Sequence, residues 1–224
     1  MKSRATSESP KMFDNTFVDA FSRTHFSVVP LLYGPAVGAL LWYSVARAGV
    51  NVTTSLVLAV LGFVLWTLAE YWLHRTFFHW VPNSAFGRRM HFIVHGVHHQ
   101  WPNDKYRLVM PPAVSIALFF IFLGLYWWLM GRFAWAFHAG YVLGYGYYDL
   151  MHYYIHHGRP KSAYFKHLRR HHMVHHFKAP TSRFGVSWTL WDRIFGTFGQ
   201  RAPTSTRSGT LGRALSAEAR RRTE

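Results

Sequence analysis

No cysteine occurs among the 224 residues of this chain. Its absence excludes a disulfide framework, a thiolate zinc site and an iron–sulfur cluster. Acidic residues are also scarce, since nine Asp and Glu stand against twenty-five Lys and Arg, for a formal net charge of +16. The basic residues flank apolar runs rather than forming one stripe with interleaved aromatic residues, so the charge does not indicate a nucleic-acid partner. Met1–Lys11 is polar, so no secretory signal is predicted.

Charge is also missing from four long apolar segments. A membrane-spanning helix needs roughly 20 apolar residues, with a range of about 17–25. The first and third segments meet this length, the second meets it if Tyr71–Leu73 continue the helix, and the fourth is shorter and contains His138. We therefore predict an all-α integral membrane protein with four transmembrane helices; the alternative is a soluble protein with buried helices. The segments are Phe26–Ala46, Val52–Ala69, Val109–Met130 and Phe133–Tyr148.

The distribution of basic residues predicts how the chain is oriented. Four precede the first apolar segment, five lie in the loop Arg75–Arg107, and fourteen follow the fourth segment, whereas the two short hairpins carry only Arg47 and Arg132. Basic loops stay on the cytoplasmic side of a membrane. Both termini and the long loop are therefore expected to face the cytoplasm.

Three regions are predicted along the chain. Residues 1–25 form a polar N-terminal segment, in which Lys11–His25 is either an interfacial amphipathic helix or an ordinary lead-in to the first span. Residues 26–199 form one membrane domain. Residues 200–224 are rich in Arg, Ser and Thr, and we expect a disordered basic tail that touches anionic lipid.

Sixteen histidines stand out against this background, and most fall in tight clusters between the apolar segments. Imidazole is a good ligand for zinc, iron and copper, and one metal ion takes roughly four to six ligands. Ten clustered imidazoles therefore suit two metal ions held close together. The candidate ligands are His74, His79, His95, His98, His99, His152, His156, His172, His175 and His176.

The spacing of these histidines supports shared ligation. In each His-x2-His-His box the first, fourth and fifth positions lie on one helical face. His74 and His79 are five residues apart and do not share an ideal face, so they require a helix end or a bend between them. The second and fourth apolar helices deliver their histidines to the same membrane surface, where the soluble clusters also lie. We predict a cytoplasmic, histidine-rich helical cap that holds a two-metal site.

The few acidic residues are placed to support the histidines. A ligating histidine usually donates its second ring N–H to a carboxylate or a carbonyl. Glu70 lies one turn before His74, Asp149 lies three residues before His152, and Asp192 lies in the closing segment. The alternative for the first two is helix capping or an ion pair with a neighbouring arginine. The histidines expected close to the ligands are His91, His157 and His171; those expected to be structural are His25, His138 and His167.

The order of the histidine boxes resembles that of the integral-membrane fatty acid hydroxylase and sterol desaturase superfamily. Additional motifs resemble its fatty acid 2-hydroxylase branch, and the similarity covers roughly Phe63 to Phe198. The run from Arg107 to Pro112 is the most specific of these motifs. The motifs are residues 104–112 (DKYRLVMPP), 148–153 (YDLMHY), 184–186 (FGV), 191–192 (WD) and 195–197 (FGT).

The resemblance implies a membrane monooxygenase that hydroxylates a fatty acyl chain at C2 with two irons, O2 and two electrons. It implies no catalytic residue beyond the metal ligands. Zinc binds nitrogen sites more tightly than ferrous iron and can replace it in purified protein. Residues expected near the substrate head group are Tyr106, Arg107, Tyr153 and Lys178.

This sequence departs from eukaryotic members of the branch because it carries no His-Pro-Gly-Gly haem motif of a fused cytochrome b5 domain. We therefore expect electrons from a separate acidic protein, such as a cytochrome b5 or a ferredoxin. Together with the absence of a retrieval signal at Arg222–Glu224, this favours a bacterial inner membrane over the endoplasmic reticulum. Alternative functions are a carotenoid or sterol hydroxylase or desaturase, a membrane metal-binding or transport protein, and an inactive lipid-binding relative.

Overall fold

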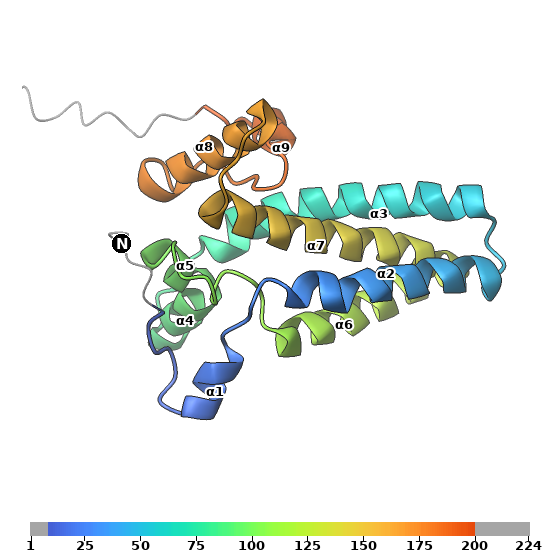
Figure 1. The fold of residues 1–224 in the computed structure, drawn as a ribbon, viewed down its shortest axis with the longest axis horizontal. Coiled ribbons are helices and arrows are strands. Elements are labelled where there is room, and N and C mark those ends of the chain that lie inside the picture. The colour runs from blue at the N-terminus through green and yellow to red at the C-terminus, as the bar shows by residue number, and fades with distance from the viewer. Residues whose placement is uncertain (1–8, 200–224) are drawn as a thin grey trace, which may run out of the picture.

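The computed structural model describes residues 9–199, and within them every regular element is helical. Four long helices lie side by side and a group of shorter helices caps one end of them (Figure 1). The long helices are α2 (Val28–Ala46), α3 (Val52–Trp72), α6 (Pro112–Met130) and α7 (Ala134–His157). The shorter elements are α1 (Thr16–Phe21), η1 (Leu73–Phe78), α4 (Ala85–His91), η2 (Phe92–Gly96), α5 (Val97–Gln100), η3 (Gly131–Phe133), α8 (Ala163–Phe177) and α9 (Leu190–Ile194).

The long helices begin and end where local sequence chemistry demands. Asn51 caps α3, because its side chain accepts a hydrogen bond from the Thr54 N–H. Pro112 occupies the first turn of α6, where a missing N–H costs nothing. Gly131 ends α6 at a φ of 53°, and the chain then reverses through η3 into α7. The predicted apolar segments therefore correspond to real helices, with α7 continuing past Tyr148 to deliver histidines to the cap.

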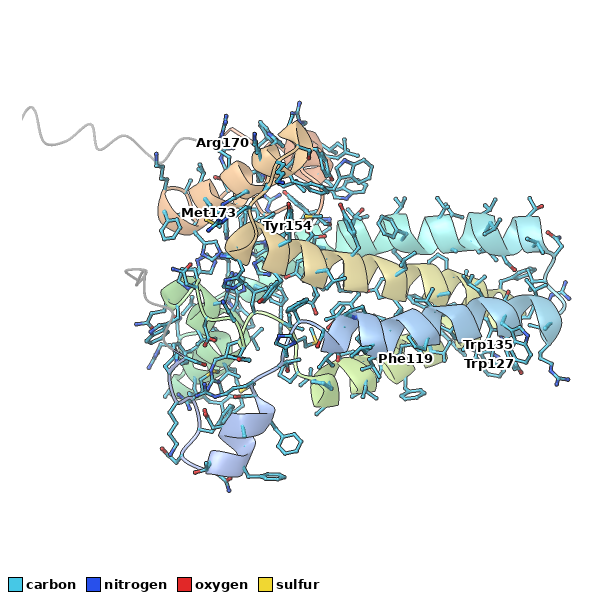
Figure 2. All side chains as sticks on the ribbon, in the orientation of Figure 1. Phe119, Trp127, Trp135, Tyr154, Arg170 and Met173 are labelled. Carbon is cyan, nitrogen blue, oxygen red and sulfur yellow. The ribbon has the colours of Figure 1, made fainter. Side chains whose placement is uncertain are left out.

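Three helical stretches are long and apolar enough to cross a membrane: Val28–Ala46, Val52–Phe78 and Pro112–His157. The third stretch combines α6, η3 and α7, which pack against each other. Apolar side chains of the long helices point outward, as expected for an integral membrane protein. Trp127 and Trp135 lie near the hairpin end of the bundle, while Arg170 and Met173 lie in the cap (Figure 2). Tryptophan near a bundle end is typical of a membrane interface.

Helix α7 is the central helix and packs against α2, α3 and α6. Its contact with α3 depends on two glycines. A β-carbon built on Gly140 would lie 1.8 Å from the Ala59 carbonyl oxygen, and one on Gly62 would lie 2.0 Å from the Phe137 carbonyl oxygen. Small residues of this kind let membrane helices approach closely. Toward the cap, Trp66 of α3 packs edge-on against aromatic rings of α7.

Replacing Gly140 by alanine should destabilise the protein by about 3 kcal/mol or more, because the added methyl group forces α3 and α7 apart. The thermal unfolding midpoint in detergent measures the effect. Gly38→Ala on α2 is the matched control, since no atom lies within 4 Å of its added β-carbon. Equal midpoints for the two variants would contradict this account of the α3–α7 contact.

The N-terminal segment lies against the cap instead of forming one long helix. Only Thr16–Phe21 is helical, and Phe17 and Phe21 stay exposed while Met12 is buried. The expected apolar face over Lys11–His25 is thus divided between the protein interior and the surface. The predicted disordered tail, residues 200–224, lies outside the described residues.

Candidate metal centre

Each histidine box is delivered by the end of a helix or by a short helix of the cap. His74 lies in η1 and His79 directly follows it, and His152 and His156 lie in the last turns of α7. The other boxes lie on η2 and α5 and on α8. The element η1 is a π-helix, whose hydrogen bonds run from residue i to i+5. This wider turn supplies the bend that the five-residue spacing required and brings the rings of His74 and His79 to 5.1 Å between centroids.

The ten predicted ligands assemble into two groups of five, and within each group the candidate ligand nitrogens all lie within 4.8 Å of one another. Most of these rings are buried. We name the groups by their positions in the chain. Group A contains His74, His79, His95, His99 and His175, and group B contains His98, His152, His156, His172 and His176.

The two His-x2-His-His boxes are divided in complementary ways. In the first box, His95 and His99 belong to group A while the histidine between them, His98, belongs to group B. In the second box the outer pair, His172 and His176, belongs to group B while His175 belongs to group A. Residues four apart lie one above the other on a helix, whereas the residue before the last is rotated by about 100°. Each box therefore contributes to both groups, which places the groups side by side.

The ring nitrogens of group B converge on His172. Its Nε2 atom lies 2.9 Å from that of His152, 3.0 Å from that of His156 and 2.9 Å from that of His176. A ring nitrogen carries at most one proton, so hydrogen bonds cannot satisfy three such neighbours at once. Group A shows similar approaches, with 3.0 Å between the Nε2 atoms of His79 and His175.

These distances fit ligands of one metal ion. Two nitrogens that each lie about 2.1 Å from an ion and subtend about 90° at it are about 3.0 Å apart, whereas a tetrahedral angle gives about 3.4 Å. The separations of 2.9 to 3.3 Å within the groups span this range and fit nitrogens that share one metal ion.

The loop after α8 fixes the rings of group A. The Nδ1 atom of His74 lies 2.5 Å from the Phe184 carbonyl oxygen, and that of His175 lies 2.7 Å from the Ser182 carbonyl oxygen. A carbonyl accepts the Nδ1 proton, so the Nε2 lone pair of each ring points into the group. Burial lowers the pKa of His175 to about 4 and that of His79 to about 3. Both rings are thus neutral at pH 7, as metal ligation requires.

Two of the three predicted supporting carboxylates contact this loop. Asp192 accepts hydrogen bonds from His171 at 2.9 Å and from the N–H groups of Phe184 and Gly185, both at 2.8 Å. Burial opposes ionisation of Asp192, but these donors outweigh it and hold the carboxyl pKa below its ordinary value. These hydrogen bonds fix the backbone at Phe184, whose carbonyl oxygen orients the His74 ring.

Glu70 holds the same loop from α3. Its carboxylate accepts hydrogen bonds from the N–H groups of Val186 and Ser187 at 2.7 and 2.9 Å, and from the Ser187 hydroxyl. It thus supports the histidines through backbone rather than by bonding a ring. The sequence predicted a supporting role for both carboxylates and gave Phe184 only as part of a motif. It did not indicate Ser182 or Ser187, because backbone carbonyls and N–H groups leave no mark in the sequence.

Replacing Glu70 by glutamine should lower metal affinity about 10–100-fold, because the amide turns a donor toward loop N–H groups and disturbs the Phe184 carbonyl. Competition with a chelator, read as retained metal per chain, measures the change. Asp14→Asn is the control, since Asp14 is an exposed acid in the N-terminal segment. Equal metal retention by the two variants would show that Glu70 does not support the metal site.

The remaining predicted neighbours occupy varied positions. Asp149 is buried, and one of its carboxylate oxygens has no hydrogen-bond partner in the structure. His91 lies close enough to His79 to lower the pKa of that ring, and His157 packs on Tyr153 with 4.7 Å between ring centroids. The histidines expected to be structural lie outside both groups; they are His25, His138 and His167.

The structure places the four residues predicted near the substrate head group in different surroundings. The Arg107 guanidinium is buried against the Asp19 carboxylate, with 2.9 Å between Nη2 and Oδ1. Tyr106 is exposed, Tyr153 stacks on Phe26, and Lys178 ends α8 at the surface. The latter three remain predicted lipid contacts, whereas Arg107 contacts the N-terminal segment through Asp19 and also lies 3.6 Å from the neighbouring Asp104 carboxylate.

Comparison with known proteins places this site in a family. The fatty acid hydroxylase family model matches residues 59–197. A dihydroceramide fatty acyl 2-hydroxylase of Arabidopsis thaliana is 37% identical over 85% of this chain and 80% of its own length. The fatty acid 2-hydroxylase of Rattus norvegicus is also 37% identical, over 84% of this chain and 56% of its own length.

A solved structure is similar as well. Full-length scs7p, of which only the hydroxylase domain is visible, superposes with a TM-score of 0.79 and 35% identity over 87% of this chain and 74% of that one. The matched family segment contains all ten histidines of groups A and B. The chain therefore belongs to the fatty acid hydroxylase family and is an oxidoreductase.

Proposed function

We propose that this protein is a membrane monooxygenase that hydroxylates a fatty acyl chain at C2. The observation that carries the proposal is the pair of buried five-histidine groups at one end of an apolar helix bundle. The names of the relatives support the substrate class, since they act on dihydroceramide fatty acyl groups or on fatty acids. Overall, the acyl chain, O2, two electrons and two protons would give the 2-hydroxy acyl chain and water.

Groups A and B would each hold one iron ion, and zinc would replace iron in protein purified without added iron. Bound iron would supply the oxidation of the C2–H bond with O2, which acid–base side chains cannot perform. The two electrons would come from a separate protein such as a cytochrome b5 or a ferredoxin. The carbonyl oxygens of Phe184 and Ser182 keep the group A lone pairs directed inward, and burial of the rings excludes water.

We further propose that α2, α3, α6 and α7 all cross the membrane, with both termini and the cap in the cytoplasm of a bacterial inner membrane. The acyl tail would lie along the bundle and its polar head near Tyr106, Tyr153 and Lys178. This arrangement would bring C2 to the histidine groups while the tail stays in the hydrocarbon. The support is the apolar surface of the long helices and the basic cap.

Lipid mass spectrometry on cells that express the intact chain, beside cells that express His175→Ala, tests the reaction. A 2-hydroxy acyl species found only with the intact chain is the expected result, and its head group identifies whether a free acid, a thioester or a ceramide is the substrate. If metal and an electron donor are supplied and no 2-hydroxy acyl species forms, the proposed hydroxylation at C2 is wrong. Hydroxylated carotenoid or sterol products would then assign the chain to another branch of the superfamily.

A further inference from the structure

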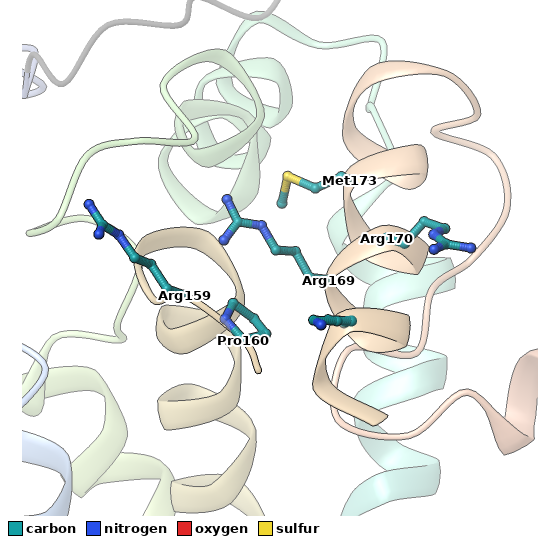
Figure 3. A pocket seen from close by; sticks show the side chains of 6 residues that line it. Arg159, Pro160, Arg169, Arg170 and Met173 are labelled. Carbon is teal, nitrogen blue, oxygen red and sulfur yellow. The ribbon is translucent and has the colours of Figure 1, made fainter. Parts of the chain in front are cut away.

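A basic cleft lies between the end of α7 and α8 (Figure 3). It is an open cavity of about 420 Å³, and no histidine of group A or B lines it. Arg169 and Met173 point from α8 toward the segment that follows α7 (Figure 3). The residues that line the cleft are Arg159, Pro160, Lys166, Arg169, Arg170 and Met173.

The cleft concentrates positive charge without compensation. Four of its six lining residues are cationic and none is acidic. Within residues 9–199, none of these four side chains forms an ion pair. Arg169 donates a hydrogen bond to the Gly158 carbonyl oxygen at 2.7 Å, which ties α8 to the segment after α7 and fixes one wall. Arg159, Lys166 and Arg170 are exposed; the Arg159 and Arg170 side chains point outward and would turn inward to contact a ligand (Figure 3).

The charge of the cleft selects a class of ligand. Arginine presents a planar fork of N–H donors that matches the oxygens of a phosphate group, and several neighbouring cations suit a group with more than one negative charge. We propose that this cleft binds a phosphate group, carried by a membrane lipid or by a dissolved molecule.

The position of the cleft gives it access to both sources of phosphate. Helix α7 has 24 residues and extends about 36 Å, which exceeds the roughly 30 Å of the bilayer hydrocarbon core but not the roughly 40–45 Å of the bilayer with its head groups. Because α7 begins directly after the hairpin at Gly131 and the cleft lies past its other end, the cleft lies at the level of the lipid head groups, next to water. This step uses the membrane placement proposed above, but phosphate binding itself does not depend on the hydroxylation reaction.

The test is saturation binding of radiolabelled inorganic phosphate to the full chain in phosphatidylcholine nanodiscs, at constant ionic strength in chloride. The double variant Arg159→Gln/Arg170→Gln should bind at least about tenfold more weakly, since two charge-assisted contacts are lost. Arg47→Gln/Arg132→Gln is the matched control, because it removes the same charge from exposed residues at the far hairpins. That control should bind phosphate like the intact chain.

Other results would overturn the proposal. Equal binding by both double variants would place phosphate at the histidine groups or on the general surface. No saturable binding by the intact chain would overturn the proposal and indicate that the basic residues bind an acidic protein instead.

Nanodiscs that contain phosphatidic acid distinguish the two sources of phosphate. Unchanged binding assigns the cleft to a dissolved ligand, and suppressed binding assigns it to a lipid head group.

Discussion

Replacing His172 by alanine is expected to remove one of two metal ions from each chain and to abolish the 2-hydroxy product. The Nε2 atom of His172 lies within 3.0 Å of three other ring nitrogens, so it is the point at which group B converges. Loss of this ring removes a ligand and leaves the other rings of the group without the neighbour that fixes their spacing. Even changes to residues that only support ligands cost about 10–100-fold, so the loss of product should exceed a hundredfold.

Elemental analysis of the purified variant and mass spectrometry of its lipid products measure the two effects together. His167→Ala is the control, since His167 lies on the same helix but belongs to neither group. His175→Ala should empty group A and leave group B loaded. If His172→Ala keeps both metal ions, or if both variants lose the same ion, then the division into two groups is wrong.

The sequence predicted which histidines cluster but not how they divide. Spacing alone assigns His98 and His99 to one box, whereas the structure places them in different groups. The division depends on how α5 and α8 are rotated against each other, and that rotation is set by tertiary packing. The π-helical turn of η1 was foreseen only as a required bend, because no local residue preference distinguishes a π-helix from an α-helix here.

The helices of the bundle were more predictable than the packing between them. Uncharged runs and turn residues such as Asn51 and Gly131 indicate where the long helices lie, because these signals are local. The close approach at Gly140 depends on which helix faces α3, which the sequence does not state. For the same reason Arg107 was expected to touch a lipid, whereas its partner Asp19 lies 88 residues earlier in the chain.

Replacing Asp19 by alanine should destabilise the protein by about 3 kcal/mol and release the N-terminal segment from the cap. The Arg107 side chain is only 2% exposed, and removing one partner of a buried ion pair costs about 3–5 kcal/mol. The lower end of this range applies, because the Asp104 carboxylate remains 3.6 Å from the Arg107 guanidinium. The thermal unfolding midpoint and hydrogen exchange of α1 measure the two effects.

Two comparisons isolate the buried pair. Arg23→Ala removes the more exposed partner of Asp19, whose side chain is 32% exposed, and should cost under about 1 kcal/mol. The variant Asp19→Ala/Asp104→Asn/Arg107→Met removes all three buried charges and should be more stable than Asp19→Ala alone, since no unpaired buried charge remains. A triple variant that is less stable than Asp19→Ala would show that an unpaired charge is not what destabilises the single variant.

The pH dependence gives a further test of the same pair. Burial alone would raise the pKa of Asp19, but the Met12 N–H and the guanidinium groups of Arg107 and Arg23 outweigh it and hold that pKa below its ordinary value. The stabilisation by ionised Asp19 is therefore complete above about pH 4, the ordinary range of an aspartate, and is lost as the pH falls further. Asp19→Asn cannot ionise, so its unfolding midpoint should lie below that of the intact chain at pH 7 and approach it on acidification. A constant difference between pH 7 and pH 3 would mean that the Asp19 charge does not hold the N-terminal segment on the cap.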